Sequence, residues 1–338
     1  MIHHRTGTLS TLALQIADRT ATVSPFVHEH AALTPLVEFR AASERAGSQV
    51  VVKCEHQQRT GSFKLRGALA KLHSIDADLR DLGVITASTG NHGLGVAHAL
   101  QALGGRGVIC VPEHASPAKL AALARYDVEI RTLGQEAGET EGLARALADE
   151  QGMPYISPYN DVDVIAGQGT LGEEILQQIG DRDFDALVLS VGGGGLISGV
   201  AATVKAARPD IRIIGASPAN DATMAASVRA GTIIEIPTSP TISDGTAGGI
   251  EPGAVTFPLC TELVDEWVLV SEQDIYAALR LTIESEHQLV EGAAATAIGA
   301  AVQVGRARPG RTVVAVSCGA NISANTLLTA LEGSQPPG

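Results

Sequence analysis

Short apolar runs, several of them rich in Val and Ile, alternate along this chain with longer Ala- and Leu-rich stretches. The expected strands are Gln49–Cys54, Gly83–Ala87, Gly107–Val111, Glu129–Thr132, Ala186–Val191, Ile211–Ala216, Glu266–Val270 and Thr312–Val316. The expected helices are Phe63–His73, Gly93–Leu103, Pro117–Tyr126, Glu136–Gln151, Gly167–Gln178, Gly195–Ala207, Ser271–Ser285 and Glu291–Val304. Apolar strands that alternate with helices form parallel sheets covered on both sides. The pattern therefore predicts an α/β fold with parallel-rich sheets and helices on both faces.

The segment 217–260 departs from this alternation. It is rich in Gly, Thr, Ser and Pro, which favour turns over regular elements. We expect it to form loops that wrap around another feature of the molecule.

The charge balance excludes two classes of partner. The chain has 24 Lys and Arg against 37 Asp and Glu, a formal net charge of −13, without clusters of Lys and Arg. Such a chain is a poor binder of nucleic acids and of anionic membrane surfaces. It can still bind a small anion, because a local group of backbone N–H groups can hold a phosphate within an acidic protein.

The sequence shows no recognisable signal for export or for insertion into a membrane. The N-terminal sequence MIHHRTGTLSTLALQIADRT has no continuous apolar stretch of a signal peptide, and Leu289–Val304 is shorter than the roughly 20 apolar residues of a membrane-spanning helix. No CxxC pair occurs among Cys54, Cys110, Cys260 and Cys318, which fits reduced thiols. We therefore expect a cytoplasmic protein.

Four consecutive glycines follow the apolar run that ends at Val191 and open an Ala-rich helix; they are Gly192, Gly193, Gly194 and Gly195. Four glycines cost much backbone entropy, which is offset where amide N–H groups point at an anion at a helix N-terminus. A tight turn alone needs one or two. The pattern predicts a phosphate site, and it is neither a P-loop nor a clear Rossmann fingerprint.

A lysine stands at the start of an expected helix, within the sequence TGSFKLRG of residues 60–67. A Lys in an apolar pocket has a lowered pKa and can form a Schiff base with a carbonyl group. Taken alone, a surface helix that carries Lys64 and Arg66 is the commoner explanation.

Two polar clusters stand at the ends of expected strands, ASTGNHG at 87–93 and VSCGAN at 316–321. Ligands bind at the carboxyl ends of parallel strands. The hydroxyls of Ser88 and Thr89, with the amides of a first helical turn, suit a carboxylate. Each cluster alone could be an N-cap or a packing contact, and a structural role is favoured for His92 alone.

These four motifs occur in the order found in the tryptophan-synthase-β-like (fold type II) pyridoxal-phosphate enzymes, which the chain resembles from about Thr34 to Asn321. The sequence KLRGA from Lys64 is similar to the serine/threonine dehydratase branch, whereas cysteine synthases and threonine synthases typically have Lys-Asp. The resemblance implies pyridoxal 5′-phosphate as cofactor, a homodimer, and a small amino-acid substrate. The implied reaction removes a β-hydroxyl group and gives a keto acid and ammonia.

The resemblance also implies roles for single residues. Lys64 looks like the Schiff-base lysine and the base that removes the α-proton. The implied cofactor contacts are Phe63 on the pyridine ring, Asn91 at its 3′-oxygen, the four glycines at the phosphate, and Gly245 and Glu291 at the other edge. The residues implied to border the substrate carboxylate are Ser88, Thr89, Gly90 and His92.

The partner implied for the pyridine nitrogen is Cys318, with Ser317 as the alternative. Either group is neutral, so the ring nitrogen stays largely unprotonated. A weaker electron sink disfavours a long-lived carbanion and favours prompt loss of a β-substituent.

Three departures from the family pattern narrow the expectation. Thr89 stands where racemase relatives have Ser. The additional methyl group hinders the Thr hydroxyl as a proton donor, so racemisation ranks behind elimination. Ser217 stands where metal-activated relatives have an acidic residue, so we expect no metal site, because divalent cations prefer several hard oxygen ligands. The short sequence after Asn321 leads us to expect no C-terminal regulatory domain.

The sequence is compatible with more than one substrate. Serine and threonine are the default for the branch, while the sequence EHQQ at 55–58, with Thr89 and Ser217, resembles the hydroxyectoine-utilisation dehydratases and their larger β-hydroxy amino acids. 3-Hydroxyaspartate is another candidate, because Arg66 could meet its second carboxylate, although the family resemblance implies a structural role for Arg66. The alternatives to a lyase are an amino-acid racemase, a catalytically silent cofactor-binding protein and, last, a plain nucleotide-binding domain.

The resemblance implies two domains with the cofactor between them. The larger one takes residues 1–68 and 156–330, and the smaller one takes residues 69–155. The smaller domain is expected to close residues 88–92 over the substrate carboxylate.

Overall fold

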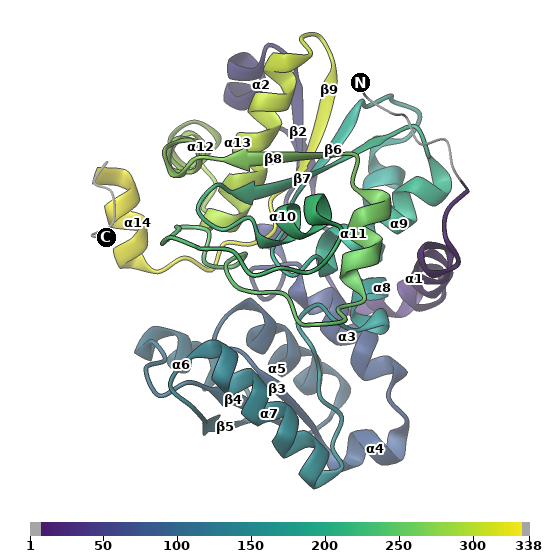
Figure 1. The fold of residues 1–338 in the computed structure, drawn as a ribbon, viewed down its shortest axis with the longest axis vertical. Helices are drawn as coiled ribbons and strands as arrows, with labels where there is room; N and C mark the ends of the chain where they lie inside the picture. Colours follow the sequence, from purple (N-terminus) through teal and green to yellow (C-terminus); the bar gives the residue numbers. More distant parts are fainter. Residues whose placement is uncertain (1–7, 333–338) are drawn as a thin grey trace.

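The computed structural model describes residues 8–332 and contains two separate sheets (Figure 1). The strands are β1 (Leu36–Glu38), β2 (Gln49–Lys53), β3 (Val84–Ala87), β4 (Gly107–Val111), β5 (Glu129–Thr132), β6 (Ala186–Ser190), β7 (Arg212–Pro218), β8 (Glu266–Val270) and β9 (Thr312–Val316). The helices are α1 (Thr11–His30), α2 (Arg40–Ala46), η1 (Glu55–Gln57), α3 (Lys64–Ser74), α4 (Ala77–Leu82), α5 (Asn91–Leu103), α6 (Pro117–Leu123), α7 (Ala137–Gln151), α8 (Val162–Ile179), α9 (Gly195–Ala207), α10 (Thr223–Ala230), α11 (Thr256–Leu263), α12 (Glu272–Glu286), α13 (Gly292–Ala307) and α14 (Ala324–Glu332).

The larger sheet has the strand order β1-β2-β9-β6-β7-β8, and every pair except β1–β2 is parallel. Helix α13 lies against β2, β9, β6 and β7 and also packs on α12 and α2. Helix α9 contacts β6 and packs on α8, which packs on α1; Figure 1 shows the two groups of helices on opposite sides of the strands. The expected parallel-rich sheet with helices on both faces is confirmed.

The smaller sheet has the order β3-β4-β5 with parallel pairing, and Tyr155 forms a parallel bridge to Ile85 beside β3. Helices α5 and α7 both contact β3 and β4. Helix α3 packs against α5 on one side and α8 on the other, so it joins the two parts seen in Figure 1. The N-terminus of α3 therefore lies where a group could touch both parts.

Every expected strand is present, but the pattern misses the short antiparallel β1 and several helices, namely α1, α2, α4, α10, α11 and α14. The expectation that 217–260 consists of loops is wrong in part, because α10 lies within it and α11 begins within it. Both helices are short, and each packs against the core through buried residues such as Met224 and Leu259. Tertiary packing rather than helix propensity stabilises elements of this length.

A buried ionic network fixes α3 to the larger sheet. The guanidinium of Arg66 binds Glu55 through both carboxylate oxygens, at 2.8 Å each, and Glu174 at 2.7 Å. Lys53 donates to the same Glu174 at 2.5 Å. All four side chains are essentially without solvent exposure, so two cations and two carboxylates neutralise each other in the interior. The suggestion that Arg66 meets a second substrate carboxylate is therefore wrong, because its donors are already taken.

Within the part of the chain that the structure describes, no helix combines the length and the apolar character that would let it cross a bilayer.

Candidate active site

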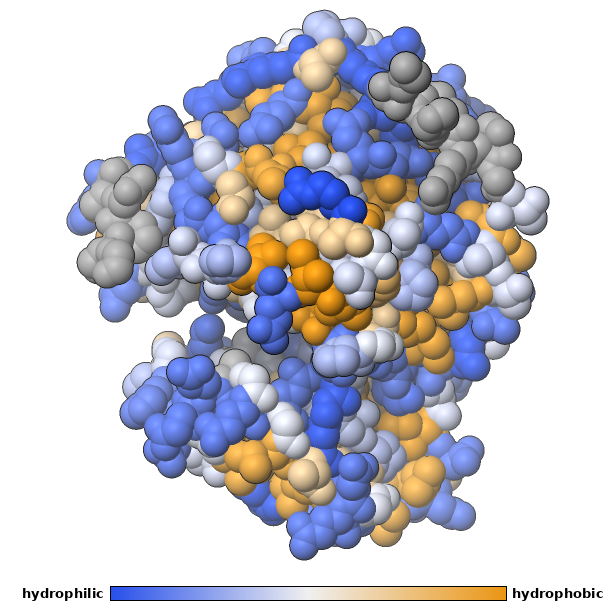
Figure 2. Space-filling model, viewed as in Figure 1, coloured by the Kyte–Doolittle hydropathy of each residue, from blue (hydrophilic) through white to orange (hydrophobic). Residues whose placement is uncertain are grey.

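Four chain segments meet between the two sheets. Lys64 begins α3, Asn91 begins α5 after β3, Gly195 begins α9 after β6, and Cys318 follows β9. Figure 2 shows that the surface is hollowed between the larger and the smaller part, at the left of the view. The motifs that sequence analysis singled out therefore come from separate elements and lie at one junction.

Lys64 has the features of a reactive amine. Its Nζ donates to the carbonyl oxygen of Pro158 at 2.8 Å and lies 5.3 Å from the ring centroid of Phe63. Burial lowers the pKa of Lys64 from 10.5 to about 8, although the nearby Cys318 and Glu291 oppose the shift. The backbone N–H of Phe63 donates to the carbonyl of Cys318 at 3.1 Å, which ties the start of α3 to the end of β9. A larger fraction of this amine is unprotonated near neutral pH than in an ordinary lysine, so more of it can act as a base or nucleophile.

The tetraglycine turn lies between β6 and α9 and is enclosed by neighbouring groups. Gly194 has φ +86°, which favours glycine. A Cβ on Gly193 would come within 2.5 Å of the Tyr159 ring, and one on Gly192 within 2.7 Å of the Thr246 carbonyl oxygen. Among the described residues no side chain caps α9, so its first-turn N–H groups can bind an anion. The turn fits a phosphate group.

Gly193→Ala should weaken binding of pyridoxal phosphate by about tenfold or more, because the added methyl group overpacks against Tyr159 and such overpacking costs about 1–3 kcal/mol. The measurement is equilibrium binding followed by visible absorbance. Gly138→Ala is the matched control, since a Cβ there has no neighbour within 4 Å. Unchanged binding by Gly193→Ala would contradict the assignment of the turn.

Glu291 is a buried carboxyl group with donors on several sides. Its two oxygens accept from the side-chain amide of Asn91 at 2.9 and 3.0 Å, and one accepts from the backbone N–H of Asn321 at 3.1 Å. Burial raises the pKa of Glu291 to about 7, and the bond from Asn91 opposes the shift. A Cβ on Gly245 would be 3.3 Å from Glu291 Oε1. The structure thus brings together three of the expected cofactor residues.

Of the two candidates for the pyridine nitrogen, Cys318 contacts Glu291, and Ser317 does not do so through its hydroxyl. The Cys318 thiol is within 3.9 Å of Glu291 and accepts from the Ser190 hydroxyl at 3.4 Å. Burial raises the pKa of the Cys318 thiol, so the group is neutral. Ser317 is fully buried, and its hydroxyl has no hydrogen-bond partner among the described residues.

The segment expected at the substrate carboxylate has two different surroundings. The Ser88 hydroxyl accepts from the backbone N–H of Gly90 at 3.1 Å, and a Cβ on Gly90 would meet nothing within 4 Å. Thr89 beside them is partly exposed. His92 is buried, and its Nε2 lies 3.0 Å from the carbonyl oxygen of Ile156. Burial lowers the pKa of His92 to about 3, so the ring is neutral, and this contact is structural.

Sequence reasoning missed two residues of the site, Tyr159 and Ser190. Tyr159 covers the tetraglycine turn and Ser190 contacts Cys318. Neither belongs to a recognisable motif; the one available signal is that Ser190 directly precedes the glycine run. Asn321, which sequence reasoning quoted only as part of a motif, donates to Asn91 at 2.6 Å.

Ser217, at the position where metal-activated relatives carry an acidic residue, is fully buried and donates to the Val191 carbonyl at 3.2 Å. Across residues 8–332, no group of three or more His, Cys, Asp or Glu side chains could hold a metal ion. Independence from a divalent cation stays a prediction.

Comparisons with known proteins find matches over most of the chain. The family model described as pyridoxal-phosphate dependent enzyme matches residues 27–319. A putative threonine dehydratase of Sinorhizobium fredii is 38% identical over 315 residues, which are 93% of this chain and 93% of that one. The structure of processed threonine deaminase isoform 2 from Solanum lycopersicum matches with TM-score 0.91 at 34% identity, covering 97% of this chain and 94% of that one. Maize serine racemase matches with TM-score 0.86 at 29% identity, covering 94% and 97%.

The family model covers most of the chain, and the similarity to the relatives extends over nearly their full length. The reactive amine, the glycine turn and the neutral thiol fit the cofactor of that family. The protein belongs to the fold type II pyridoxal-phosphate-dependent enzymes, in the serine/threonine dehydratase family.

Proposed function

We propose that the protein removes water from a small β-hydroxy amino acid and releases a keto acid and ammonia. The observation that carries this proposal is geometric: Lys64 begins α3 where the N–H of Phe63 donates to the carbonyl of Cys318 at 3.1 Å, so the amine and the buried thiol belong to one site. When bound, pyridoxal phosphate supplies an aldehyde that captures the substrate amine and a ring that accepts electron density. A neutral partner for that ring favours prompt loss of the β-hydroxyl group.

Different groups of the site bind the phosphate, bind the substrate carboxylate and move the proton. The amides of residues 192–195 bind the phosphate, and Ser88 with the first-turn amides of α5 binds the substrate carboxylate. Lys64 takes the α-proton at Nζ as general base, and its lowered pKa leaves the amine partly free near neutral pH. The β-hydroxyl leaves as water, and the proton that it takes up balances the α-proton that Lys64 has removed. The enamine product then hydrolyses to the keto acid and ammonia.

Several finer assignments belong to the same proposal. Serine and threonine are the first candidate substrates, supported by the relatives, and the hydroxyectoine-derived amino acids remain candidates from the sequence EHQQ at 55–58. A racemase is the second function, because the maize serine racemase shares the fold. Thr89 argues against it, since its methyl group hinders a proton donor at that position. We also propose a cytoplasmic homodimer.

Two ion pairs connect the part built on the small sheet, here proposed as the moving domain 69–155, with the rest of the chain. Lys119 of α6 lies 3.5 Å from Asp244, and Arg145 of α7 lies 2.6 Å from Glu251. Both pairs are partly exposed, so each stabilises weakly. Weak pairs of this kind are compatible with opening and closing around a substrate.

The substrate panel that tests the proposal holds L- and D-serine, L-threonine, both 3-hydroxyaspartates and a hydroxy-diaminobutyrate. Ammonia, keto acid and the opposite enantiomer are measured together. The proposal predicts equal amounts of ammonia and keto acid from at least one compound. Formation of the opposite enantiomer without ammonia would replace the lyase with a racemase.

The pH dependence of cofactor capture should follow Lys64. Its pKa is lowered from 10.5 to about 8, so the free amine that attacks an aldehyde becomes abundant as the pH rises through about 8. We therefore expect the initial rate of pyridoxal phosphate uptake by the cofactor-free protein to rise between pH 7 and about 9 and then to level off. Stopped-flow absorbance measures it. A rate that still rises steeply above pH 10 would mean that the amine behaves as an ordinary lysine.

A further inference from the structure

The loop 243–248 lies between the tetraglycine turn and Glu291. The backbone of Thr246 lies so close to Gly192 that a Cβ there would be 2.7 Å from the Thr246 carbonyl oxygen. Gly245 faces Glu291, whose Oε1 would be 3.3 Å from a Cβ on that glycine. The loop therefore lies against both the tetraglycine turn and Glu291, and a shift of the loop would change its contacts with both.

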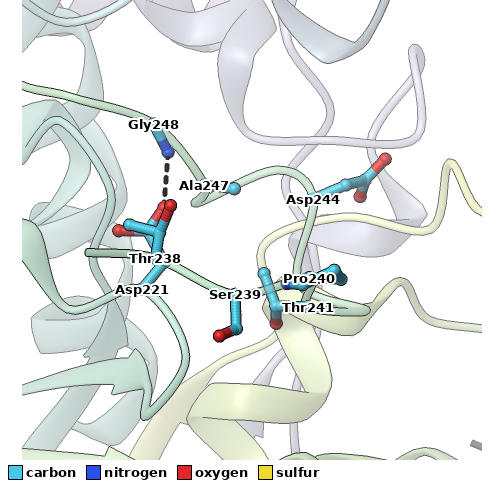
Figure 3. Close-up of a pocket in the computed structure, with 8 residues that line it drawn as sticks. All are labelled: Asp221, Thr238, Ser239, Pro240, Thr241, Asp244, Ala247 and Gly248. Carbon is cyan, nitrogen blue, oxygen red and sulfur yellow. Dashed lines mark hydrogen bonds between the residues drawn. The ribbon is translucent and has the colours of Figure 1, made fainter. Parts of the chain in front are cut away.

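The hydrogen bonds inside the loop shape it without attaching it to the sheet. Thr246 N–H donates to the Ser243 carbonyl at 2.9 Å, and the hydroxyls of the same two residues lie 2.7 Å apart. At the start of the loop, the backbone N–H of Ile242 donates to Glu272 at 2.9 Å. At its end, the backbone N–H of Gly248 donates to Asp221 Oδ2 at 2.8 Å (Figure 3). Two carboxylates thus hold the two ends.

Packing gives little support at the Asp221 end. A Cβ on Gly248 would meet nothing within 4 Å. An open pocket of about 470 Å³ lies beside it and is lined by Asp221, Thr238, Ser239 and Thr241, among others (Figure 3). Because nothing in residues 8–332 lies within 4 Å of a Cβ on Gly248, the bond to Asp221 is the attachment that the structure describes at this end.

Asp221 is itself held firmly to the larger sheet. It follows β7 closely, and its backbone N–H donates to Pro218 at 3.1 Å, while Ala219 N–H donates to Val270 of β8 at 2.8 Å. The side chain is only 5% exposed, and its other oxygen accepts from the Thr223 hydroxyl at 2.8 Å. Neutral donors thus occupy both oxygens of a buried carboxylate, which makes the loss of either bond costly.

We propose that Asp221 is a positioning residue: through the N–H of Gly248 it fixes the loop 243–248 against the tetraglycine turn and Glu291. Its effect on the cofactor rests on the proposed function, whereas its effect on the loop does not. Asp221→Ala leaves the Gly248 N–H unpaired and loosens that end of the loop, while the bond from Ile242 to Glu272 and the ion pair of Asp244 with Lys119 remain. Asp221→Asn can keep both bonds, because its Oδ1 can accept from Gly248 and its amide can donate to the Thr223 oxygen.

The test compares the holoenzymes of the wild type, Asp221→Ala, Asp221→Asn and Ser239→Ala. Ser239 lines the same pocket without contacting the loop through its hydroxyl, so its variant is the matched control. Hydrogen exchange of the peptide that contains residues 243–248 reports on the loop. Release of cofactor into a phosphatase-containing buffer, and kcat and KM at saturating cofactor, report on the site.

In Asp221→Ala we expect faster exchange in 243–248 and cofactor release accelerated by about tenfold or more, as for loss of one charge-assisted hydrogen bond. Asp221→Asn should restore most of both, and Ser239→Ala should match the wild type. Wild-type exchange in Asp221→Ala, or equal losses in all three variants, would overturn the proposal. If the wild type binds no cofactor, the proposed function fails, and the exchange data alone decide on Asp221. If Asp221→Ala does not fold, faster exchange in Asp221→Ser supports the proposal and wild-type exchange overturns it.

Discussion

Lys64→Ala is expected to lower turnover by roughly 10³-fold or more, because a positioned general base alone contributes about 10²–10⁴-fold. The variant also loses the amine that anchors the cofactor covalently. Folding should be little affected, since the Lys64 amine makes one hydrogen bond, to the carbonyl of Pro158. The measurement is ammonia and keto-acid release on the best substrate of the panel, with circular dichroism as a check on folding.

Lys205→Ala is the matched control for this result. Lys205 lies on α9 and pairs with Asp265 at 2.7 Å, away from the expected substrate. It should retain wild-type turnover. Full activity of Lys64→Ala, without any added amine, would remove Lys64 from the mechanism.

Arg66→Met should destabilise the protein by about 3–5 kcal/mol, the range for breaking a buried ion pair by removal of one partner. The variant leaves Glu55 without its ion-pair partner, while among the described residues Glu174 keeps Lys53 and the partly exposed His28. Urea unfolding measures the change. Arg229→Met on the exposed end of α10 is the control and should change the free energy of unfolding by less than about 0.5 kcal/mol.

The cost of Arg66→Met should depend on pH in a definite direction. Arg66 lowers the pKa of Glu55, against the opposing effect of burial. A carboxyl group of lowered pKa stabilises the wild type above its unfolded pKa of about 4.5, and this contribution is lost as the pH falls through the folded pKa. The difference in free energy of unfolding between the two proteins should therefore shrink below pH 5. A difference that is constant from pH 7 to pH 4 would contradict this account of the network.

Local patterns predicted the parts of the site that depend on one segment. Lys64 at a helix start and four glycines at a strand-to-helix turn have a physical meaning that is visible without a partner. The contact between Asn91 and Glu291 joins residues 200 positions apart, and its geometry came from no single segment. The burial of His92 against Ile156 likewise depends on long-range packing.

Patterns also failed where tertiary contacts override local preference. Taken alone, Arg66 suggests a surface or substrate residue, yet two buried carboxylates, Glu55 and Glu174 at 11 and 108 positions away along the chain, hold its guanidinium. The segment 217–260 contains α10 and α11 although its composition favours loops. The bond from Gly248 to Asp221 and the close approach of Thr246 to Gly192 are long-range contacts that composition does not reveal.

Reduction of the holoenzyme with borohydride, followed by peptide mapping, tests most directly that Lys64 carries the cofactor at a catalytic site. We predict one pyridoxyl group per chain, on Lys64, with loss of ammonia release in proportion to labelling. Labelling of another lysine, or labelling of Lys64 without loss of activity, would contradict the account.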